Sequence, residues 1–345
     1  MRILMAMAGL GGGGAESFFE RLAIAFSARK HDVLAAIRPY ELRREKLEAS
    51  GVSVHWIRFG GLADLASRHR IRRLIRKARP DVTLSFMSRA ASFIPAGGAS
   101  PHIARLGGYY PLKHYRTADH LVVNTQDIGR WLIAQGAPPD TVSYVPNFTV
   151  PSVISPAIRS DYAVPDMATL VVALGRLHRN KGFDVLLNAL AKQPDLYLWL
   201  AGDGPERKTL DRMTDGLGLR DRVCILGWVD DPAPLIAAAD IVAVPSRYEP
   251  LGNVILEAWS MAKPIVAAAS AGPVSLIENG VTGRLVPVDD SLRLGQALAD
   301  VSRLPDRGAS LGASGRERLN AEFSEETVLD QYLDLFERLK TQTSA

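Results

Sequence analysis

Short runs of apolar residues alternate with amphipathic segments along most of the chain. In the first half these runs predict buried strands at Ile3 to Ala8, His31 to Arg38, Ser53 to Ile57, Val82 to Phe86 and Leu121 to Asn124. In the second half they predict strands at Leu170 to Leu174, Tyr197 to Ala201, Val223 to Leu226, Ile241 to Val244 and Ile265 to Ala269. Strands that alternate with helical patterns are typical of parallel sheets covered by helices on both faces. The pattern therefore predicts an α/β protein with two such sheets.

Each half of the chain opens with a strand, a glycine-containing turn and a helix. In the first half, Gly9 to Gly14 precedes a helix predicted over Ala15 to Arg29. In the second half, Gly175 to Gly182 precedes a helix predicted over Phe183 to Ala191. This repeated opening indicates two Rossmann-like domains, each built on a doubly wound parallel sheet.

A proline-rich stretch, Val145 to Pro165, predicts the connection between the domains, because prolines interrupt helices and stiffen an extended chain. We therefore predict an N-terminal domain over residues 1–160 and a C-terminal domain over residues 161–323. The chain ends with a helix predicted over Glu325 to Lys340, whose apolar side needs a surface to cover it.

The composition is that of a globular protein with proper cores. Hydrophobic residues make up 47% of the 345 residues and charged residues 23%. No stretch approaches the roughly 18 consecutive apolar residues of a transmembrane helix, and the apolar start, Met1 to Ala8, is too short for a signal peptide. The single cysteine, Cys224, has no partner for an intramolecular disulfide. These features predict a cytoplasmic protein.

The strongest chemical signal is the segment from Arg247 to Ala258, which follows a predicted strand and runs into a helix. Open α/β sheets bind ligands at the carboxyl ends of their strands. Amides at the start of a helix attract anions, and here they belong to Gly252, Asn253 and Val254. Glu249 lies on the loop, and Glu257 lies eight residues later on the helix. A carboxylate that accepts from two vicinal hydroxyls, such as those of a ribose, gains about 1.5–3 kcal/mol for each bond.

The second signal is the turn from Gly175 to Gly182, which also lies between a strand and a helix. Arg176 and Lys181 in this turn are placed to converge on a diphosphate. The turn lacks the spacing of a P-loop, which argues against hydrolysis of a nucleoside triphosphate.

The third signal is the glycine run after the first strand. Gly9, Gly11 and Gly14 match the spacing of a dinucleotide-binding fingerprint. That fingerprint expects an acidic residue about 20 positions later, but the nearest acid to the end of the second strand is Glu41. The missing acidic residue argues against a nicotinamide-dependent dehydrogenase.

These motifs together resemble the retaining glycosyltransferases of family 4, which have the GT-B architecture. Glu249 to Glu257 is similar to the Glu-x₇-Glu motif of that family, and Gly175-Arg176 with Lys181-Gly182 is similar to its diphosphate clamp. Gly13-Gly14-Ala15-Glu16 matches its N-terminal glycine loop. Further similar segments are Ala201 to Pro205, Gly272-Pro273 and Glu278 to Gly283. The likeness covers nearly the whole chain.

The resemblance implies two Rossmann-like domains that face a central cleft, with a last helix, residues 324–345, that packs back on the first. It implies a UDP- or GDP-sugar donor in the second domain and a glycan or glycolipid acceptor in the first. Glu257 would hold the ribose. The implied donor-binding residues are Gly13, Gly14, Gly175, Arg176, Lys181, Gly204, Glu249, Leu251, Gly252, Asn253, Val254 and Glu257. The implied catalytic residues are Arg176, Lys181 and Glu249, and no metal or other cofactor is expected.

The acceptor side departs from the family. Our candidates there are Glu16, Arg105, Gly107, Gly108 and His114. Many relatives place a histidine where this chain has Gly107. We therefore assign no protein group as the base. If the acceptor attacks the face that the leaving group departs from, as the resemblance implies, the departing phosphate can take the acceptor's proton and no protein base is needed.

A basic helix is predicted in the first domain. Its basic residues are Arg68, Arg70, Arg72, Arg73, Arg76, Lys77 and Arg79. Such a helix is suited to an anionic membrane surface, to phosphorylated glycans, or to plain solvation. No nucleic-acid motif accompanies the charge, so we expect no nucleic-acid partner. We favour a lipid-linked or lipopolysaccharide-type acceptor and a peripheral position on the inner face of the cytoplasmic membrane, in bacterial lipopolysaccharide or polysaccharide biosynthesis.

Three other functions stay open at this point. A nucleotide-sugar epimerase of similar shape would convert the donor without an acceptor. A dehydrogenase would bind a nicotinamide cofactor. A catalytically inactive sugar-binding homologue would bind a ligand without turnover.

Overall fold

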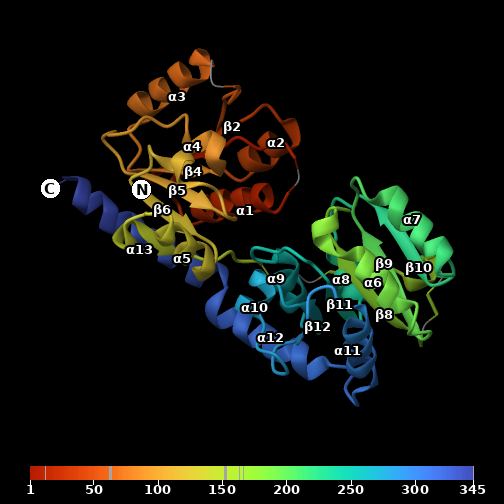
Figure 1. Cartoon of the computed structure of the whole chain (residues 1–345). Helices are drawn as coiled ribbons and strands as arrows, with labels where there is room; N and C mark the ends of the chain where they lie inside the picture. Colours follow the sequence, from red (N-terminus) through yellow and green to blue (C-terminus); the bar gives the residue numbers. More distant parts are fainter. Residues whose placement is uncertain (12, 62–63, 151–153, 163, 166, 345) are drawn as a thin grey trace. The chain divides into compact units, whose positions relative to one another are not determined.

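The computed structural model contains two compact units (Figure 1). It describes residues 1–11, 13–61, 64–150, 154–162, 164–165 and 167–344. Unit 1 comprises Met1–Phe148 together with Glu325–Ala345, and unit 2 comprises Thr149–Ser324.

The chain passes into unit 2 earlier than the residue 160 that we predicted. Ala157 already packs on unit 2, because its N–H donates to the carbonyl of Pro234 at 2.9 Å. Arg159 also forms an ion pair with Asp240, 2.9 Å between nitrogen and oxygen.

Unit 1 is built on a seven-stranded parallel sheet with the order β3-β2-β1-β4-β5-β6-β7. Its strands are β1 Arg2–Met7, β2 Asp32–Ile37, β3 Ser53–Trp56, β4 Val82–Phe86, β5 His102–Leu106, β6 His120–Val123 and β7 Val142–Tyr144. Its helices are α1 Gly14–Ala28, α2 Glu41–Ala49, α3 Leu65–Ala78, α4 Met87–Ala91, α5 Gln126–Ala134 and α13 Glu325–Ser344, with short 3-10 turns at Leu112–Tyr115 and Pro139–Thr141.

Unit 2 is built on a six-stranded parallel sheet with the order β10-β9-β8-β11-β12-β13. Its strands are β8 Thr169–Leu174, β9 Leu196–Ala201, β10 Val223–Gly227, β11 Ile241–Val244, β12 Ile265–Ala268 and β13 Arg284–Val286. Its helices are α6 Phe183–Leu190, α7 Arg207–Gly216, α8 Ala233–Ala238, α9 Asn253–Ser260, α10 Ala271–Leu276, α11 Ser291–Arg303 and α12 Ala309–Glu322, with 3-10 turns at Arg159–Tyr162 and Arg179–Lys181. The two doubly wound sheets confirm the predicted fold class.

The apolar side of α13 completes the core of unit 1. Val328, Tyr332 and Phe336 are fully buried in the cluster that also contains the inward face of α1. Outside this cluster, Arg29, the C-cap of α1, forms an ion pair with Asp330. The residues at either end of the chain therefore share one core.

The core of unit 2 lies on both faces of its sheet. One face packs around Trp199 and Trp259, and the other around the apolar residues of α6 and α11. Within the described residues, no helix is both long enough and apolar enough to cross a membrane.

Candidate functional site

The candidate site of unit 2 lies where the winding of its sheet reverses. From β8 the chain continues to β9 on one side, while β11 pairs with β8 on the other side. Loops that follow two such strands diverge and leave a crevice at the carboxyl edge of the sheet. The turn after β8 carries Gly175 to Gly182, and the loop after β11 carries Glu249.

Lys181 and Glu249 meet at this point. The ammonium of Lys181 forms an ion pair with the carboxylate of Glu249, and the hydroxyl of Ser246 also donates to that carboxylate at 3.3 Å. The Lys181 side chain is 25% exposed and that of Glu249 is 13% exposed. The structure thus brings together two of the three predicted catalytic residues.

Arg176 does not join this pair. Its side chain is exposed, and it makes no hydrogen bond or ion pair within the described part of the chain. Gly175 lies beneath Lys181, since a Cβ at residue 175 would be 3.3 Å from Cε of Lys181.

Glycines let the loops of the site approach one another closely. Gly182 has φ of +65°, and a Cβ there would lie 2.1 Å from the carbonyl oxygen of Pro245. A Cβ at Gly272 would lie 2.3 Å from the carbonyl oxygen of Leu251. The carbonyl of Leu177 similarly touches the predicted donor residue Gly204. Any larger residue at 182 or 272 would push these loops apart.

Arg247 holds the loops in place. Its guanidinium donates two bonds of 2.7 Å to the carboxylate of Asp184 on α6 and one of 2.5 Å to Asp289, which follows β13. It also donates to the carbonyl of Arg179 at 2.8 Å. The hydrogen bond to Asp184 raises the pKa of Arg247 above its ordinary value. Sequence reasoning missed this role, because the partners lie far from Arg247 in the chain and no motif marks them.

Helix α9 begins at this crevice. Gly252 precedes it with φ of +93° and forms its N-cap, Asn253 and Val254 are its first two residues, and Leu251 is buried beneath the loop. Glu257 lies one turn into α9 and is half-buried.

The predicted N-terminal loop lies in unit 1. Gly13 caps α1 and Gly14 is its first residue. The carboxylate of Glu16 folds back over this loop, since a Cβ at Gly9 would lie 2.3 Å from Glu16 Oε1. Buried Arg43 of α2 holds the loop by donating to the carbonyls of Gly9 and Gly11, both at 2.9 Å.

Of the other acceptor-side candidates, three lie together on and just after β5, and one lies apart. Arg105 is buried in β5, Gly107 and Gly108 follow that strand, and His114 is exposed in the 3-10 turn at Leu112–Tyr115. His102 is buried, and its two ring nitrogens are hydrogen-bonded to Ser85 Oγ at 2.8 Å and to the carbonyl of Thr117 at 2.8 Å. Its side chain therefore belongs to the core of unit 1.

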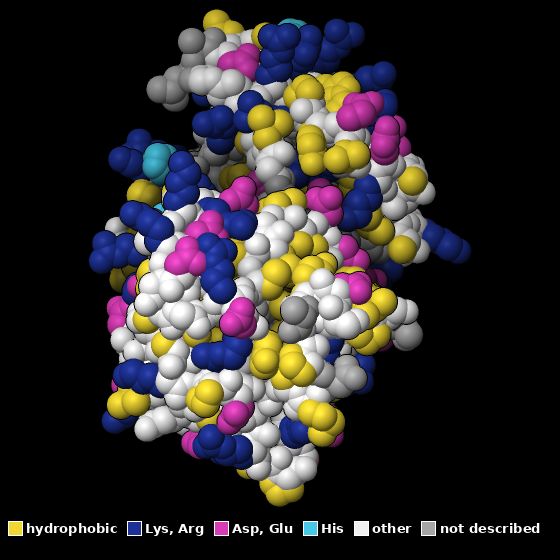
Figure 2. All heavy atoms as spheres, turned by 90° about the vertical axis from the view of Figure 1, so that its right-hand side faces the viewer, with side chains coloured by type: hydrophobic (Ala, Val, Ile, Leu, Met, Phe, Trp, Pro, Cys, Tyr) yellow, Lys and Arg dark blue, Asp and Glu magenta, His cyan; other side chains and the backbone are white. Residues whose placement is uncertain are grey.

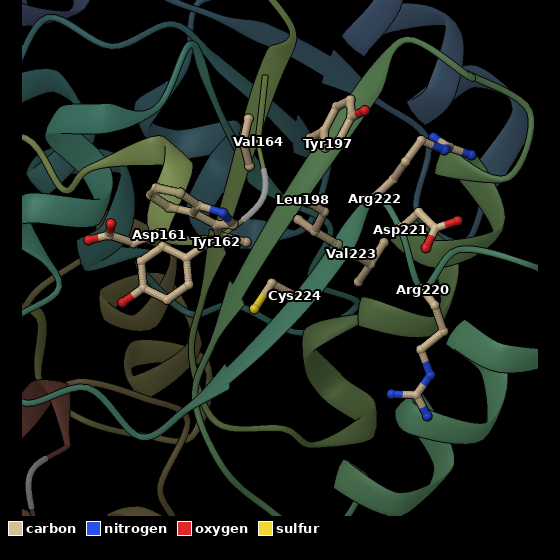
Figure 3. Close-up of a pocket in the computed structure, with 11 residues that line it drawn as sticks. Asp161, Tyr162, Val164, Tyr197, Leu198, Arg220, Asp221, Arg222, Val223 and Cys224 are labelled. Carbon is tan, nitrogen blue, oxygen red and sulfur yellow. The ribbon is translucent and has the colours of Figure 1, made fainter. Parts of the chain in front are cut away.

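A separate hollow of about 460 Å³ opens toward the amino-terminal ends of β9 and β10 (Figure 3). Tyr162, Trp199 and Cys224 are among its lining residues. It contains none of the predicted site residues, and those of unit 2 lie at the carboxyl edge of the same sheet. Within the described residues, no three histidine, cysteine or acidic side chains gather as a metal site would require.

Comparison with known proteins identifies the family. Residues 12–153 match Glycosyltransferase Family 4, and residues 168–303 match Glycosyl transferases group 1. The lipopolysaccharide core biosynthesis glycosyltransferases LpsD and LpsE of Rhizobium meliloti are 36% and 33% identical to this chain, each over 94% of this chain and 95% of its own length.

A solved structure of Anabaena HepE in complex with UDP and glucose has the same fold. It superposes with a TM-score of 0.86 at 24% identity, covering 98% of this chain and all of the other. The resemblance found in the sequence is therefore confirmed. The chain belongs to glycosyltransferase family 4 and is a glycosyltransferase with the GT-B fold.

Proposed function

We propose that this glycosyltransferase transfers a sugar, with retention of configuration, from a UDP- or GDP-sugar to a glycan or glycolipid in bacterial lipopolysaccharide or polysaccharide synthesis. The observation that carries the proposal is the meeting of Lys181 and Glu249 where the winding of the second sheet reverses. The names of the two Rhizobium relatives support the class of acceptor.

The donor occupies the carboxyl edge of the second sheet in this proposal. Lys181 and the exposed Arg176 take the diphosphate, and Glu257 accepts from the ribose hydroxyls. Glu249, Gly252 and Asn253 contact the transferred sugar. Gly13 and Gly14, in the glycine turn of unit 1, stay donor contacts that only the family resemblance implies.

Donor binding exchanges the partners of Lys181. Its ammonium pairs with Glu249 in the structure. A diphosphate carries more negative charge than one carboxylate and replaces it beside the ammonium. Glu249 is then free to accept from hydroxyls of the sugar, and such charge-assisted bonds are among the stronger ones in proteins.

The chemical step breaks the bond between the anomeric carbon and the diphosphate oxygen. The electron pair leaves with the diphosphate, and the fixed cations stabilise that growing charge more in the transition state than in the ground state. The acceptor oxygen attacks the same face of the sugar and forms the new bond. Its proton passes to the departing phosphate, so the step needs no protein base.

A ligand screen followed by product analysis tests the proposal. Either UDP or GDP should raise the melting temperature of unit 2, by roughly 5 °C or more at a hundredfold excess over Kd. The NMR coupling of the new glycosidic bond should then show the anomeric configuration of the donor. Absence of any effect from both nucleotides, or a product of inverted configuration, would contradict the proposal.

Helix α3 supports a membrane-associated acceptor. Six basic residues, on α3 or directly after it, are exposed and form no ion pair within the described part of the chain: Arg70, Arg72, Arg73, Arg76, Lys77 and Arg79. Figure 2 shows Lys and Arg side chains gathered at the top of the view, over this helix. Ile71 packs inward and is fully buried, whereas Leu65 at the start of the helix is 73% exposed. We propose that this face docks on anionic lipid headgroups.

A further inference from the structure

Gly107 and Asn124 lie side by side at the carboxyl ends of β5 and β6. Leu106 pairs with Val123 in the sheet, and the N–H of Asn124 donates to the carbonyl of Leu106 at 3.3 Å. The side chain of Arg105 reaches the same place, since its Nη1 is 3.7 Å from the position that a Cβ at Gly107 would occupy.

Arg105 is a buried cation without a carboxylate partner. It is 3% exposed, its Nε donates to the hydroxyl of Tyr332 at 3.1 Å, and its Nη2 donates to Asn147. The guanidinium lies 4.4 Å from the ring centre of Phe18. Its remaining nitrogen, Nη1, has no hydrogen-bond partner in the described part of the chain. A buried charge left uncompensated is costly, so a ligand that supplied the opposite charge would be favoured.

Asn124 presents a second donor to the same space. Its side chain is 4% exposed, and its Nδ2 is 3.4 Å from the Cβ position at Gly107. Its Oδ1 is buried without a partner among the described residues. Helix α5 begins two residues later, and the positive end of its dipole adds to the attraction for an anion. Asp127, the carboxylate in the first turn of α5, is held by Tyr109 and Arg130.

We propose that Arg105 Nη1 and Asn124 Nδ2 bind an oxyanion, a phosphate or carboxylate group of the acceptor, in the space over Gly107. Both atoms are donors and one belongs to a cation, so they suit an oxyanion better than a neutral hydroxyl. Gly107 has no side chain, so the space between the two donors stays open. The assignment of the oxyanion to the acceptor rests on the proposed function, whereas the binding of an anion does not.

Inorganic phosphate is the first probe, in a full-length variant that carries Arg176→Ala and Lys181→Ala to remove the proposed donor clamp. Phosphate should raise its melting temperature above that in chloride of equal ionic strength. Gly107→Ala should abolish this rise and leave the melting temperature in chloride unchanged, because the added Cβ meets its neighbours at 3.4 Å or more. Gly98→Ala is the matched control, since its Cβ also has room, 3.7 Å from the carbonyl of Ser100, and the phosphate effect should persist.

Asn124→Leu provides a second variant of similar shape. It removes the Nδ2 donor together with the unpartnered Oδ1, so it should be at least as stable in chloride and still lose the phosphate effect. Acetate should act like phosphate, more weakly.

A phosphate effect that persists in Gly107→Ala, or the lack of any phosphate effect in the clamp-free chain, overturns the site. A larger effect from UDP than from phosphate in that chain overturns the assignment to the acceptor. A phosphate effect in a wild-type chain that binds neither UDP nor GDP supports the site and contradicts the proposed function instead.

Discussion

Lys181 and Glu249 come from loops 68 residues apart, and each is largely removed from water. A partly buried ammonium or carboxylate without a partner is unfavourable, and each of these two groups supplies the other's partner. The pair therefore holds the cation close to where a departing diphosphate would need it. This arrangement reduces the reorganisation that the reaction requires.

Replacing Lys181 by alanine is expected to lower turnover by about 10²–10³ at saturating donor, because it removes one preorganised charge beside the leaving group. Turnover is measured together with thermal unfolding, so that a loss of folding is recognised. Lys192→Ala, at an exposed lysine just after α6, is the matched control and should behave as wild type. Near-normal turnover in the Lys181 variant would remove this residue from the catalytic step.

Single residues also mark the limit of what the sequence predicts. Lys181 and Glu249 were predicted because each belongs to a local strand, turn and helix pattern that marks its position. The role of Arg247 and the contacts of Arg105, which was predicted only as an acceptor-side candidate, were not, because their partners are set by the packing of separate elements. Arg247 reaches Asp184 on α6 and Asp289 after β13, and nothing in the intervening sequence indicates either contact.

At the scale of elements, long apolar runs were located well and short or polar ones were not. Strands β7 and β13 have three residues each, too few to show a pattern. Strand β5 is fully buried but carries His102 and Arg105, whose polarity hides it. Both side chains have partners that only the fold supplies, namely Ser85 for His102 and Tyr332 for Arg105. Short length and buried polar residues with distant partners therefore account for these missed strands.

Helix α3 carries the prediction that belongs to this scale. Replacing Arg72, Arg73 and Arg76 with glutamine should weaken binding to anionic vesicles about a hundredfold at low salt, since each basic residue near the surface contributes about 1 kcal/mol. Sedimentation with phosphatidylglycerol vesicles, compared with neutral phosphatidylcholine vesicles, measures the binding.

The matched control for α3 removes the same charge elsewhere. Lys30, Lys113 and Arg116 are exposed cations of unit 1 outside this helix, and their replacement with glutamine should leave vesicle binding nearly unchanged. An equal loss in both triple variants would show that net charge, rather than the α3 face, governs the attraction. A wild-type chain that fails to sediment would contradict membrane docking altogether.

For the whole molecule, buried and half-buried histidines distinguish the two units. Burial lowers the pKa of four of them, His31, His55, His102 and His120, and all four lie in unit 1. The shift of His120 is large, to a pKa of about 4, because burial disfavours its charged form and Arg338 of α13 adds to the effect. Unit 2 has only His178.

These shifts predict that unit 1 loses stability as the pH falls from about 6.5 toward 4. In this range the histidines of the unfolded chain bind protons, whereas the same histidines in the folded unit stay neutral. Unfolding therefore becomes more favourable as the pH falls. The lowered pKa values of carboxyls such as Asp81 act only below about 4, where the unfolded carboxyls gain protons. Urea midpoints measured between pH 7 and 5 should therefore fall, and less steeply in His120→Asn. His69→Gln, at an exposed histidine of α3, should keep the wild-type slope. A midpoint that rises on acidification would show that protonation of the buried histidines does not govern the stability of this unit.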